Sequence, residues 1–452
     1  MLATWVAWLC PNVSSVEIPA TELSGGATTI YQDGQNAFAL PLANISTANR
    51  RAHVIGNSFF NKNWIAAPGS PTARDGLGPL FNARSCSACH RRDGRGLPPS
   101  SDLRGLLIRL SLPGSPPQSL PTPHPILGTQ LATDAIPGAT PEGSLQVTYE
   151  RLPDAFPDGK TYQLQQPRYQ ITLTPDNREL EPDILTSPRL APPVFGLGLL
   201  EAIPDERLRE LADPDDTNQD GISGRFNRVW DATSQSHRLG RFGWKANQPD
   251  LVSQIAAAFA NDLGITSRLF PDEALTPSQG RRWAALPKGG EPELSDHILK
   301  RILRYQQTLA PPARRGIERR DVQRGGDLFV SVGCHHCHQP THQTGAHPEV
   351  PELSHQTIHP YTDLLLHDMG LGLADHRPDH AASGTEWRTP PLWGIGLTQT
   401  VTGEACYLHD GRARSLQEAI LWHGGEAANA QTRYRHLPRA DRQALLAFLR
   451  SL

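Results

Sequence analysis

Three stretches of the chain carry apolar residues at the spacing of one face of an α-helix. The first lies between Pro249 and Gly264, the second spans residues 293–309, and the third occupies residues 439–452. A proline before the first stretch and a glycine after it are ordinary helix boundaries. We therefore predict a helix at each of these three places.

Residues 111–240 follow a different pattern. They are rich in proline, glycine, threonine and aspartate, and the two pieces that begin at Tyr162 and Tyr169 are strand-like. Clusters of these small and polar residues between periodic segments are typical of loops. We interpret this stretch as a large loop-rich insertion that contains short β strands.

Composition narrows the class of protein. The chain has 452 residues, which is enough for about two or three domains, and its formal net charge of −3 gives no indication of nucleic-acid binding. No apolar run is long enough to span a membrane. Proline (41 residues) and glycine (39 residues) are abundant, which favours long loops around a modest set of helices.

The chemistry is concentrated in a motif that occurs twice. Both copies read C-x-x-C-H, the attachment signal for a c-type haem, in which two thiols bind the porphyrin and the histidine ligates the iron. The copies are Cys86-Ser-Ala-Cys89-His90 and Cys334-His-His-Cys337-His338. In each, a glycine lies eight residues and a phenylalanine five residues before the first cysteine. We interpret these matching contexts as an internal repeat.

Other interpretations of the cysteines are weaker. A thioredoxin-like pair needs no histidine after its second cysteine, and structural zinc sites usually have short spacers between cysteine pairs. The remaining cysteines, Cys10 and Cys406, either form a disulfide or stay free. Because haem is attached to thiols outside the bacterial cytoplasm, we expect an exported, periplasmic protein. Residues 2–10 form an apolar run but lack the basic residues of an export signal.

The sixth ligand of the second haem has two candidates. Ser415-Leu-Gln-Glu418 has the spacing of a capping box, and the helix that it predicts places His423 on the apolar face. Met369 is the alternative, since methionine is a common ligand in cytochromes c. The residue pattern leaves both open, and His124 in the insertion is a candidate ligand of the first haem.

Asp262 is out of place on the helix predicted between Pro249 and Gly264. It continues the apolar face at the C-terminal end, where burial and the helix dipole both disfavour a negative charge. Both effects raise the pKa of a carboxyl group, and such groups are candidate functional sites. The alternative is a helix that ends early, with Asp262 capping a turn.

An acidic loop stands near the end of the insertion. Its oxygen ligands alternate, and Gly221 follows at the sixth position, as in the first half of a calcium loop. The alternating positions are Asp216, Asn218, Asp220 and Ile222. The twelfth position holds Asn227 in place of a glutamate. Two interpretations stay open: a single calcium ion, or an aspartate-rich turn held by its own hydrogen bonds.

Five phrases of the chain carry a family resemblance. They are Ser187-Pro-Arg-Leu-Ala-Pro-Pro-Val-Phe-Gly, Asp220-Gly-Ile-Ser-Gly-Arg-Phe-Asn, His367-Asp-Met-Gly, Glu386-Trp-Arg-Thr-Pro-Pro and Tyr407-Leu-His-Asp-Gly-Arg. Together with the two haem motifs they resemble the bacterial di-haem cytochrome c peroxidases. They are more similar to a related group of di-haem oxidoreductases, described as peroxidases or thiol oxidoreductases, and less similar to the methylamine-utilisation di-haem enzyme. The resemblance covers most of residues 55–452.

The resemblance implies roles for particular residues. Trp244 and Gln254 keep the family's interval between the tryptophan that relays electrons between the haems and the glutamine of the peroxide pocket. Asp262 resembles the acidic residue of that pocket, two residues earlier and with aspartate in place of glutamate. The family's sixth ligand of the second haem follows the histidine of the Tyr-x-His-Asp-Gly phrase by fourteen residues. That position is His423 here, so the resemblance favours His423 over Met369.

The fold implied by this resemblance is mainly α, with two cytochrome-c-like haem domains and the loop-rich insertion in the first. We expect an N-terminal segment at residues 1–50 and a first haem domain at 51–310, with the insertion at about 111–240. A linker at 311–319 and a second haem domain at 320–452 follow.

The predicted function is a di-haem, peroxidase-like oxidoreductase with two covalently bound c-type haems. Hydrogen peroxide would be reduced at the first haem, where Asp262 acts as general acid/base and Gln254 orients the peroxide. A small cytochrome or cupredoxin would refill the second haem, which passes electrons on through Trp244. The alternatives are a non-catalytic electron-transfer cytochrome and an enzyme that oxidises a protein or thiol substrate. The oligomeric state stays open, although the peroxidases are usually dimers.

Overall fold

The computed structural model describes residues 16–115 and 119–452, so Cys10 lies outside it. About 30% of the chain is helical and 18% is in strands, and the strands of the described residues form two-stranded antiparallel pairs. The expectation of a mainly α fold built from two cytochrome-c-like domains was therefore wrong, because the class is mixed. The main reason is the insertion, which contributes strands of 13 residues each where short ones were expected.

The described residues contain the following helices and strands. The helices are α1 (Thr47–Asn61), α2 (Cys86–Cys89), α3 (Leu197–Glu201), α4 (Asp205–Leu211), α5 (Leu251–Asp262), α6 (Pro277–Arg282), α7 (Asp296–Gln307), α8 (Arg320–Val332), α9 (Thr398–Thr402), α10 (Leu416–Trp422), α11 (Ala428–His436) and α12 (Arg439–Ser451). The paired strands are β1 (Leu80–Phe81) with β3 (Asp134–Ala135), β2 (Leu106–Ser111) with β6 (Leu185–Leu190), β4 (Gly143–Ala155) with β5 (Thr161–Leu173), β7 (Arg228–Asp231) with β8 (Ser236–Leu239), β9 (His342–Gln343) with β10 (Thr357–Ile358), and β11 (Leu366–Asp368) with β12 (Glu386–Arg388). The three helices predicted from apolar periodicity are confirmed as α5, α7 and α12.

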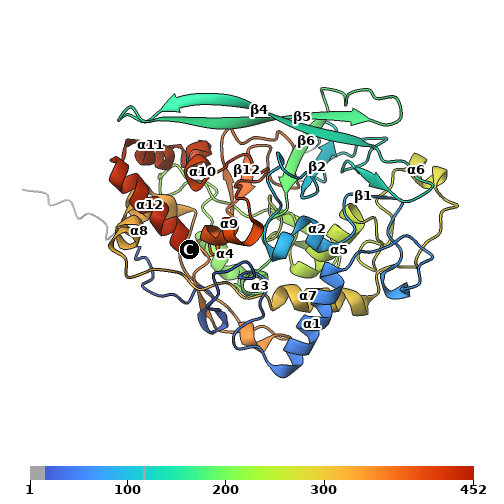
Figure 1. Ribbon diagram of the computed structural model, residues 1–452, viewed down its shortest axis with the longest axis horizontal. Helices are drawn as coiled ribbons and strands as arrows, with labels where there is room; N and C mark the ends of the chain where they lie inside the picture. Colours follow the sequence, from blue (N-terminus) through green and yellow to red (C-terminus); the bar gives the residue numbers. More distant parts are fainter. Residues whose placement is uncertain (1–15, 116–118) are drawn as a thin grey trace, which may run out of the picture.

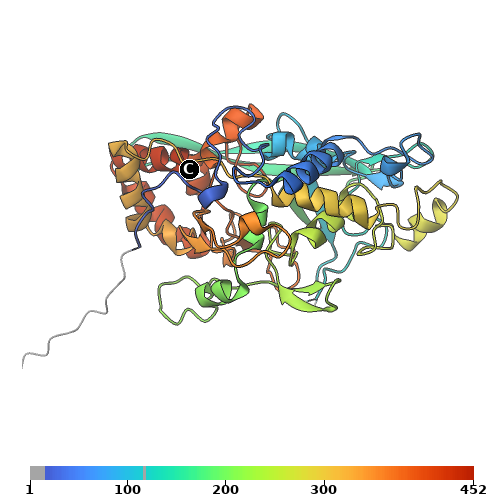
Figure 2. The same ribbon diagram turned by 90° about the horizontal axis from the view of Figure 1, so that it is seen from below.

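Two helix pairs stand toward opposite ends of the long axis, α1 with α7 and α8 with α12 (Figure 2). Each pair approaches closely at a glycine. A Cβ atom on Gly56 of α1 would lie 2.1 Å from the carbonyl oxygen of Arg301, and one on Gly325 of α8 would lie 2.1 Å from that of Ala444. Because real side chains cannot approach a backbone so closely, both contacts require glycine.

The same two pairs reveal how the haem motif repeats in space. Phe60 of α1 contacts the ring of Tyr305, with centroids 5.2 Å apart, and Phe329 of α8 contacts that of Phe448 at 5.1 Å. The structural counterpart of Phe329 is therefore Phe60. Phe81, which the sequence spacing aligns with Phe329, lies in strand β1 instead. The first copy has an additional segment between its helix and its C-x-x-C-H motif, so the matching spacing of Phe81 does not reflect a shared structure.

The hairpin β4–β5 runs along one edge of the molecule and reaches the helices at the end of the chain (Figure 1). At its tip, Arg442 of α12 donates to Asp158 at 2.6 Å and lies 3.9 Å above the ring of Phe156. Further along, Gln165 donates to the carbonyl of Arg412 at 3.0 Å. The hairpin thus ties the insertion to the second half of the chain, residues 320–452. The predicted domain boundaries stay a prediction.

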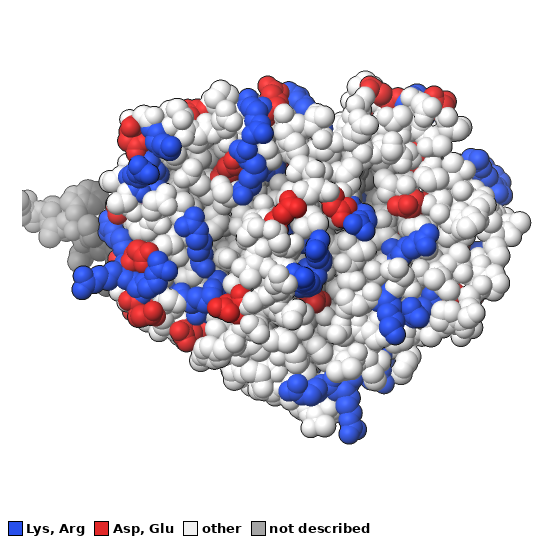
Figure 3. Space-filling view, in the orientation of Figure 1, with Lys and Arg blue, Asp and Glu red and all other residues white. Residues whose placement is uncertain are grey.

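Two surface properties bear on partners. None of the helices in the described ranges is sufficiently long and apolar to cross a membrane. On the face shown in Figure 3, lysine and arginine side chains are interspersed with aspartate and glutamate.

The close approach of α8 and α12 predicts a contrast between two neighbouring glycines. Gly325→Ala should lower the free energy of unfolding by about 1–3 kcal/mol, because the new methyl group overpacks the contact with α12. Gly326→Ala is the matched control, since its Cβ would meet its nearest atoms at 3.5 Å, an ordinary contact. Denaturant unfolding of the haem-loaded proteins measures both. Equal stability of the two variants would contradict the helix contact.

Candidate functional site

One cavity of about 650 Å³ lies between the two halves of the chain, and both C-x-x-C-H motifs line it. The four motif cysteines form no disulfide within the described residues. The cavity brings together most residues that the sequence singled out. Those lining it are Cys86, Cys89, His90, Cys334, Cys337, His338, His423, Trp244, Gln254, Asp262, Asp220, Ile222 and Met369.

Three histidines in this cavity are oriented in the same way. The Nδ1–H of each donates to a backbone carbonyl: His90 to Pro192 at 2.7 Å, His338 to Tyr361 at 3.0 Å and His423 to Ala419 at 2.7 Å. A carbonyl can only accept, so the proton is on Nδ1 and the lone pair is on Nε2, as iron ligation requires. Burial lowers the pKa of His90 and of His338 to about 4 and also lowers that of His423, which keeps the rings neutral.

His423 lies at the end of its helix. Helix α10 ends at Trp422, and His423 is the extended residue that follows, so the predicted helix was one residue too long. The hydrogen bond to Ala419 nevertheless holds the ring against the last turn. Met369 lines the same cavity. His124 is not among the lining residues, and its Nδ1 accepts backbone N–H groups of its own turn.

Asp262 is the last residue of α5, so the helix does not end early. Its Oδ1 accepts a hydrogen bond from the Gln130 amide at 3.1 Å and lies 4.0 Å from Nη2 of Arg109. Burial raises the pKa of Asp262, and the charge of Arg109 and the hydrogen bond from Gln130 oppose this only in part. The raised pKa expected from the sequence is confirmed. Gln254, two turns earlier on the same helix, lines the same cavity.

Trp244 is held rigidly in the cavity wall. Its indole Nε1–H donates to the carbonyl of Leu190 at 2.8 Å, its own carbonyl accepts from the N–H of Arg388 at 2.8 Å, and Arg95 lies 5.7 Å above its ring. Arginines are also frequent around the cavity, where they suit the carboxylates of haem propionates. Those in the wall are Arg95, Arg109, Arg189, Arg388 and Arg433. Nε of Arg95 is buried without a partner among the described residues, as a donor awaiting an anionic group would be.

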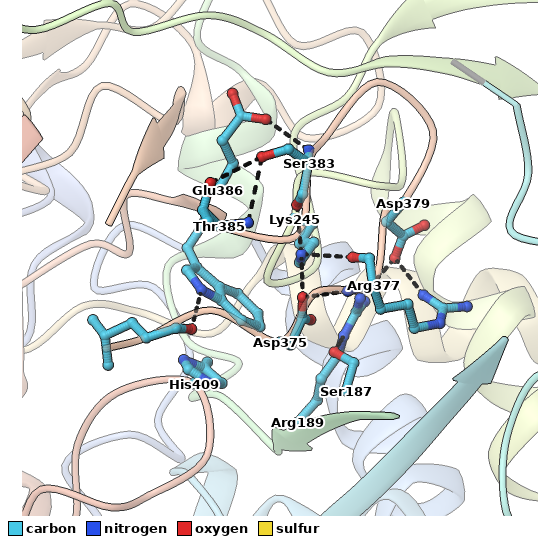
Figure 4. A network of polar contacts seen from close by, with 12 residues as sticks. Ser187, Arg189, Lys245, Asp375, Arg377, Asp379, Ser383, Thr385, Glu386 and His409 are labelled. Carbon is cyan, nitrogen blue, oxygen red and sulfur yellow. Dashed lines mark hydrogen bonds and ion pairs between the residues drawn. The ribbon is translucent and has the colours of Figure 1, made fainter. Parts of the chain in front are cut away.

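A buried charge network around Lys245, the residue after Trp244 in the sequence, had no signal in the sequence (Figure 4). Lys245 is fully buried, and its Nζ donates to Asp375 at 2.8 Å and to two backbone carbonyls. Nζ of Lys245 also lies 4.6 Å from the centre of the Trp387 ring. The ring of His409 stacks on the ring of Trp387, with centroids 3.8 Å apart. Through these contacts Lys245 connects the segment that carries Trp244 to the second half of the chain.

The acidic loop is held by its own hydrogen bonds. Oδ2 of Asp216 accepts from the N–H of Gly221 at 3.2 Å, Asn218 accepts from Asp220 at 2.9 Å, and Asp220 accepts from Ile222 at 2.9 Å. This is the arrangement of the second interpretation of the loop, and calcium binding stays a prediction. Asp216 and Asn218 are not among the residues that line the cavity.

Comparison with known families agrees with this geometry. A family model described as "Di-haem oxidoreductase, putative peroxidase" matches residues 19–111 and 132–452. This chain belongs to the di-haem oxidoreductase family. The match includes both C-x-x-C-H motifs, α5 and His423, together with most of the insertion. None of the proteins of curated function matches the chain. The family predicted from the sequence is thus confirmed, and its description implies two haems.

Because Lys245 is buried, replacing its charged partner by a neutral side chain of the same size should strongly lower the free energy of unfolding. Asp375→Asn leaves the buried lysine without its counter-charge and should lower the free energy of unfolding by about 3–5 kcal/mol. Glu150→Gln is the matched control, because it makes the same chemical change in an exposed ion pair with Arg168 and should cost less than about 1 kcal/mol. Denaturant unfolding measures both. Similar small losses would show that Asp375 does not anchor Lys245.

Proposed function

We propose that this di-haem oxidoreductase reduces hydrogen peroxide at the haem ligated by His90, with electrons that come from the haem ligated by His338. The main support is the cavity, because it places a carboxyl group of raised pKa and an amide beside the first motif. The free thiols of both motifs and the free Nε2 of His90 and His338 fit covalently attached c-type haems. When bound, the haems supply iron centres that carry single electrons and activate peroxide.

Asp262 is the group that moves protons in this proposal. Its free carboxyl oxygen takes the proton from one oxygen of the peroxide and returns it to the other, so that the O–O bond breaks with water as the leaving group. The reaction as a whole consumes two protons and two electrons and releases two waters. Gln130 and Arg109 hold Oδ1 and so leave Oδ2 to face the cavity. The amide of Gln254 orients the peroxide.

His338 and His423 would hold the second haem, because each gives its Nδ1–H to a backbone carbonyl and so leaves Nε2 for the iron. That haem would supply an iron centre that carries electrons. Histidine in place of methionine should give that haem a lower potential, since methionine ligation raises it. In this proposal Trp244, which lines the cavity shared by both motifs, is the relay. A small cytochrome or cupredoxin is the external donor. Because c-type haems are attached outside the bacterial cytoplasm, the proposal includes export of the protein. It also includes a calcium ion in the acidic loop.

A purely electron-transferring cytochrome is the weaker alternative. It needs a sixth ligand on the first haem, and His124, its candidate, does not line the cavity. Its ring is engaged by the backbone of its own turn.

The role of Asp262 is tested by a substitution that keeps the size of the side chain but removes its ability to exchange a proton. Asp262→Asn should slow the peroxide-dependent change in the haem absorption spectrum about 10²–10⁴-fold, because the amide cannot act as an acid or base. Glu142→Gln is the control: Glu142 is another buried acid, with a pKa that burial raises to about 7, and it lies outside the cavity. Stopped-flow absorption of proteins with equal haem content makes the comparison. An unchanged rate in Asp262→Asn would exclude this role.

A further inference from the structure

The two histidines of the C-x-x-C-H motifs stand in matching aromatic surroundings. The ring of Phe60 lies 6.2 Å from that of His90, and the ring of Phe329 lies 6.4 Å from that of His338. Behind each phenylalanine stands one further aromatic ring on the partner helix, at 5.2 Å and 5.1 Å. In the second half of the chain this ring belongs to a phenylalanine, Phe448. In the first half it belongs to Tyr305.

The additional hydroxyl group of Tyr305 has a specific partner. Tyr305 has no exposed surface, and its O–H donates to Oδ1 of Asp93 at 2.7 Å. The side chain of Asp93 is also buried. Asp93 follows His90 by three residues, and the corresponding position after His338 is Thr341. Both halves of the hydrogen bond are therefore present at the first haem site and replaced at the second.

The Asp93 carboxylate differs from the two other carboxylates in the described residues that accept a hydrogen bond from a tyrosine. Tyr162 donates to Asp154 at 2.6 Å, but Asp154 also lies 3.0 Å from Arg435. Tyr169 donates to Asp410 at 3.0 Å, but Asp410 is also paired with Arg412 at 2.8 Å. A neighbouring cation makes a carboxylate a weaker base. Among the described residues, no lysine, arginine or histidine forms an ion pair with Asp93. Asp93 is thus a buried base without a counter-charge, in contact with a phenol.

We propose that Tyr305 is a redox-active tyrosine that gives one electron to the first haem site and its phenolic proton to Asp93. The oxidant is the haem site after its reaction with hydrogen peroxide, so this inference rests on the proposed function. The phenolic O–H bond breaks, an O–H bond forms on Oδ1 of Asp93, and a neutral tyrosyl radical remains. The electron passes by way of Phe60 and His90. When the external donor returns an electron, the proton goes back from Asp93 to the phenoxyl oxygen.

This arrangement gives the enzyme a place to keep an oxidising equivalent when the electron donor is absent. Transfer of the proton to a carboxylate within hydrogen-bond distance leaves no net charge on the ring, which a buried site would otherwise disfavour. The second haem has no such pair, which fits its role as a carrier.

Freeze-quench EPR of the ferric, haem-loaded protein with peroxide and without donor tests the inference. A tyrosyl radical should form, and Tyr305→Phe should abolish its signal. That variant recreates the ring contact that Phe448 already makes, so it should fold. Tyr434→Phe is the matched control and should retain the signal, because Tyr434 is equally buried but its hydroxyl has no partner in the described residues. Asp93→Asn, which still accepts a hydrogen bond but is too weak a base, should lose the signal.

The outcomes separate this inference from the proposed function. If peroxide changes the haem spectrum but the wild type gives no tyrosyl signal, or Tyr305→Phe retains one, the inference is overturned and the peroxidase proposal stands. If peroxide changes no haem spectrum, the proposed function fails. Flash oxidation with a photogenerated ruthenium(III) complex then tests the tyrosine directly: a tyrosyl signal that disappears only in Tyr305→Phe and Asp93→Asn supports the redox role, and any other pattern overturns it.

Discussion

The buried ion pair between Lys245 and Asp375 is the contact on which the shape of the site depends most. Burial of a lysine is costly, and the cost is recovered only if its oxygen partners are held in place. Asp375 belongs to the second half of the chain, whereas Lys245 follows Trp244, which the first half supplies. The pair therefore requires the two halves to stay in one relative position. The position of Trp244 in the cavity wall follows from this requirement.

The chemistry of the cavity depends on a second constraint, the orientation of its polar groups by backbone atoms. His90, His338 and His423 each give Nδ1–H to a carbonyl, and this leaves Nε2 for a metal. Oδ1 of Asp262 accepts from an amide of the insertion and lies near an arginine of β2, while its second oxygen forms no hydrogen bond within the described residues. The insertion thus contributes directly to the orientation of a carboxyl group in the cavity wall.

Local signals in the sequence predicted the parts of the site that depend on local structure. The C-x-x-C-H motifs, helix α5 and the raised pKa of Asp262 all follow from residues close together in the chain. The length of the β4–β5 hairpin was underestimated because apolar and polar residues alternate in only part of each strand, as in Leu145–Tyr149 and Tyr169–Leu173, while Pro153 and Pro167 interrupt the pattern between these parts and the turn. Contacts such as Lys245–Asp375 and Tyr305–Asp93 join distant segments, and neither partner has a distinguishing local pattern.

The most direct measurement of the central claim is the EPR and absorption spectrum of the ferric, haem-loaded protein before and after one equivalent of peroxide. The claim is that the cavity leaves the first haem open on the side of Asp262 while His423 closes the second. It predicts one high-spin and one low-spin haem at rest, with the high-spin signal changing when peroxide is added. Two low-spin haems that do not respond to peroxide, even after partial reduction, would contradict it.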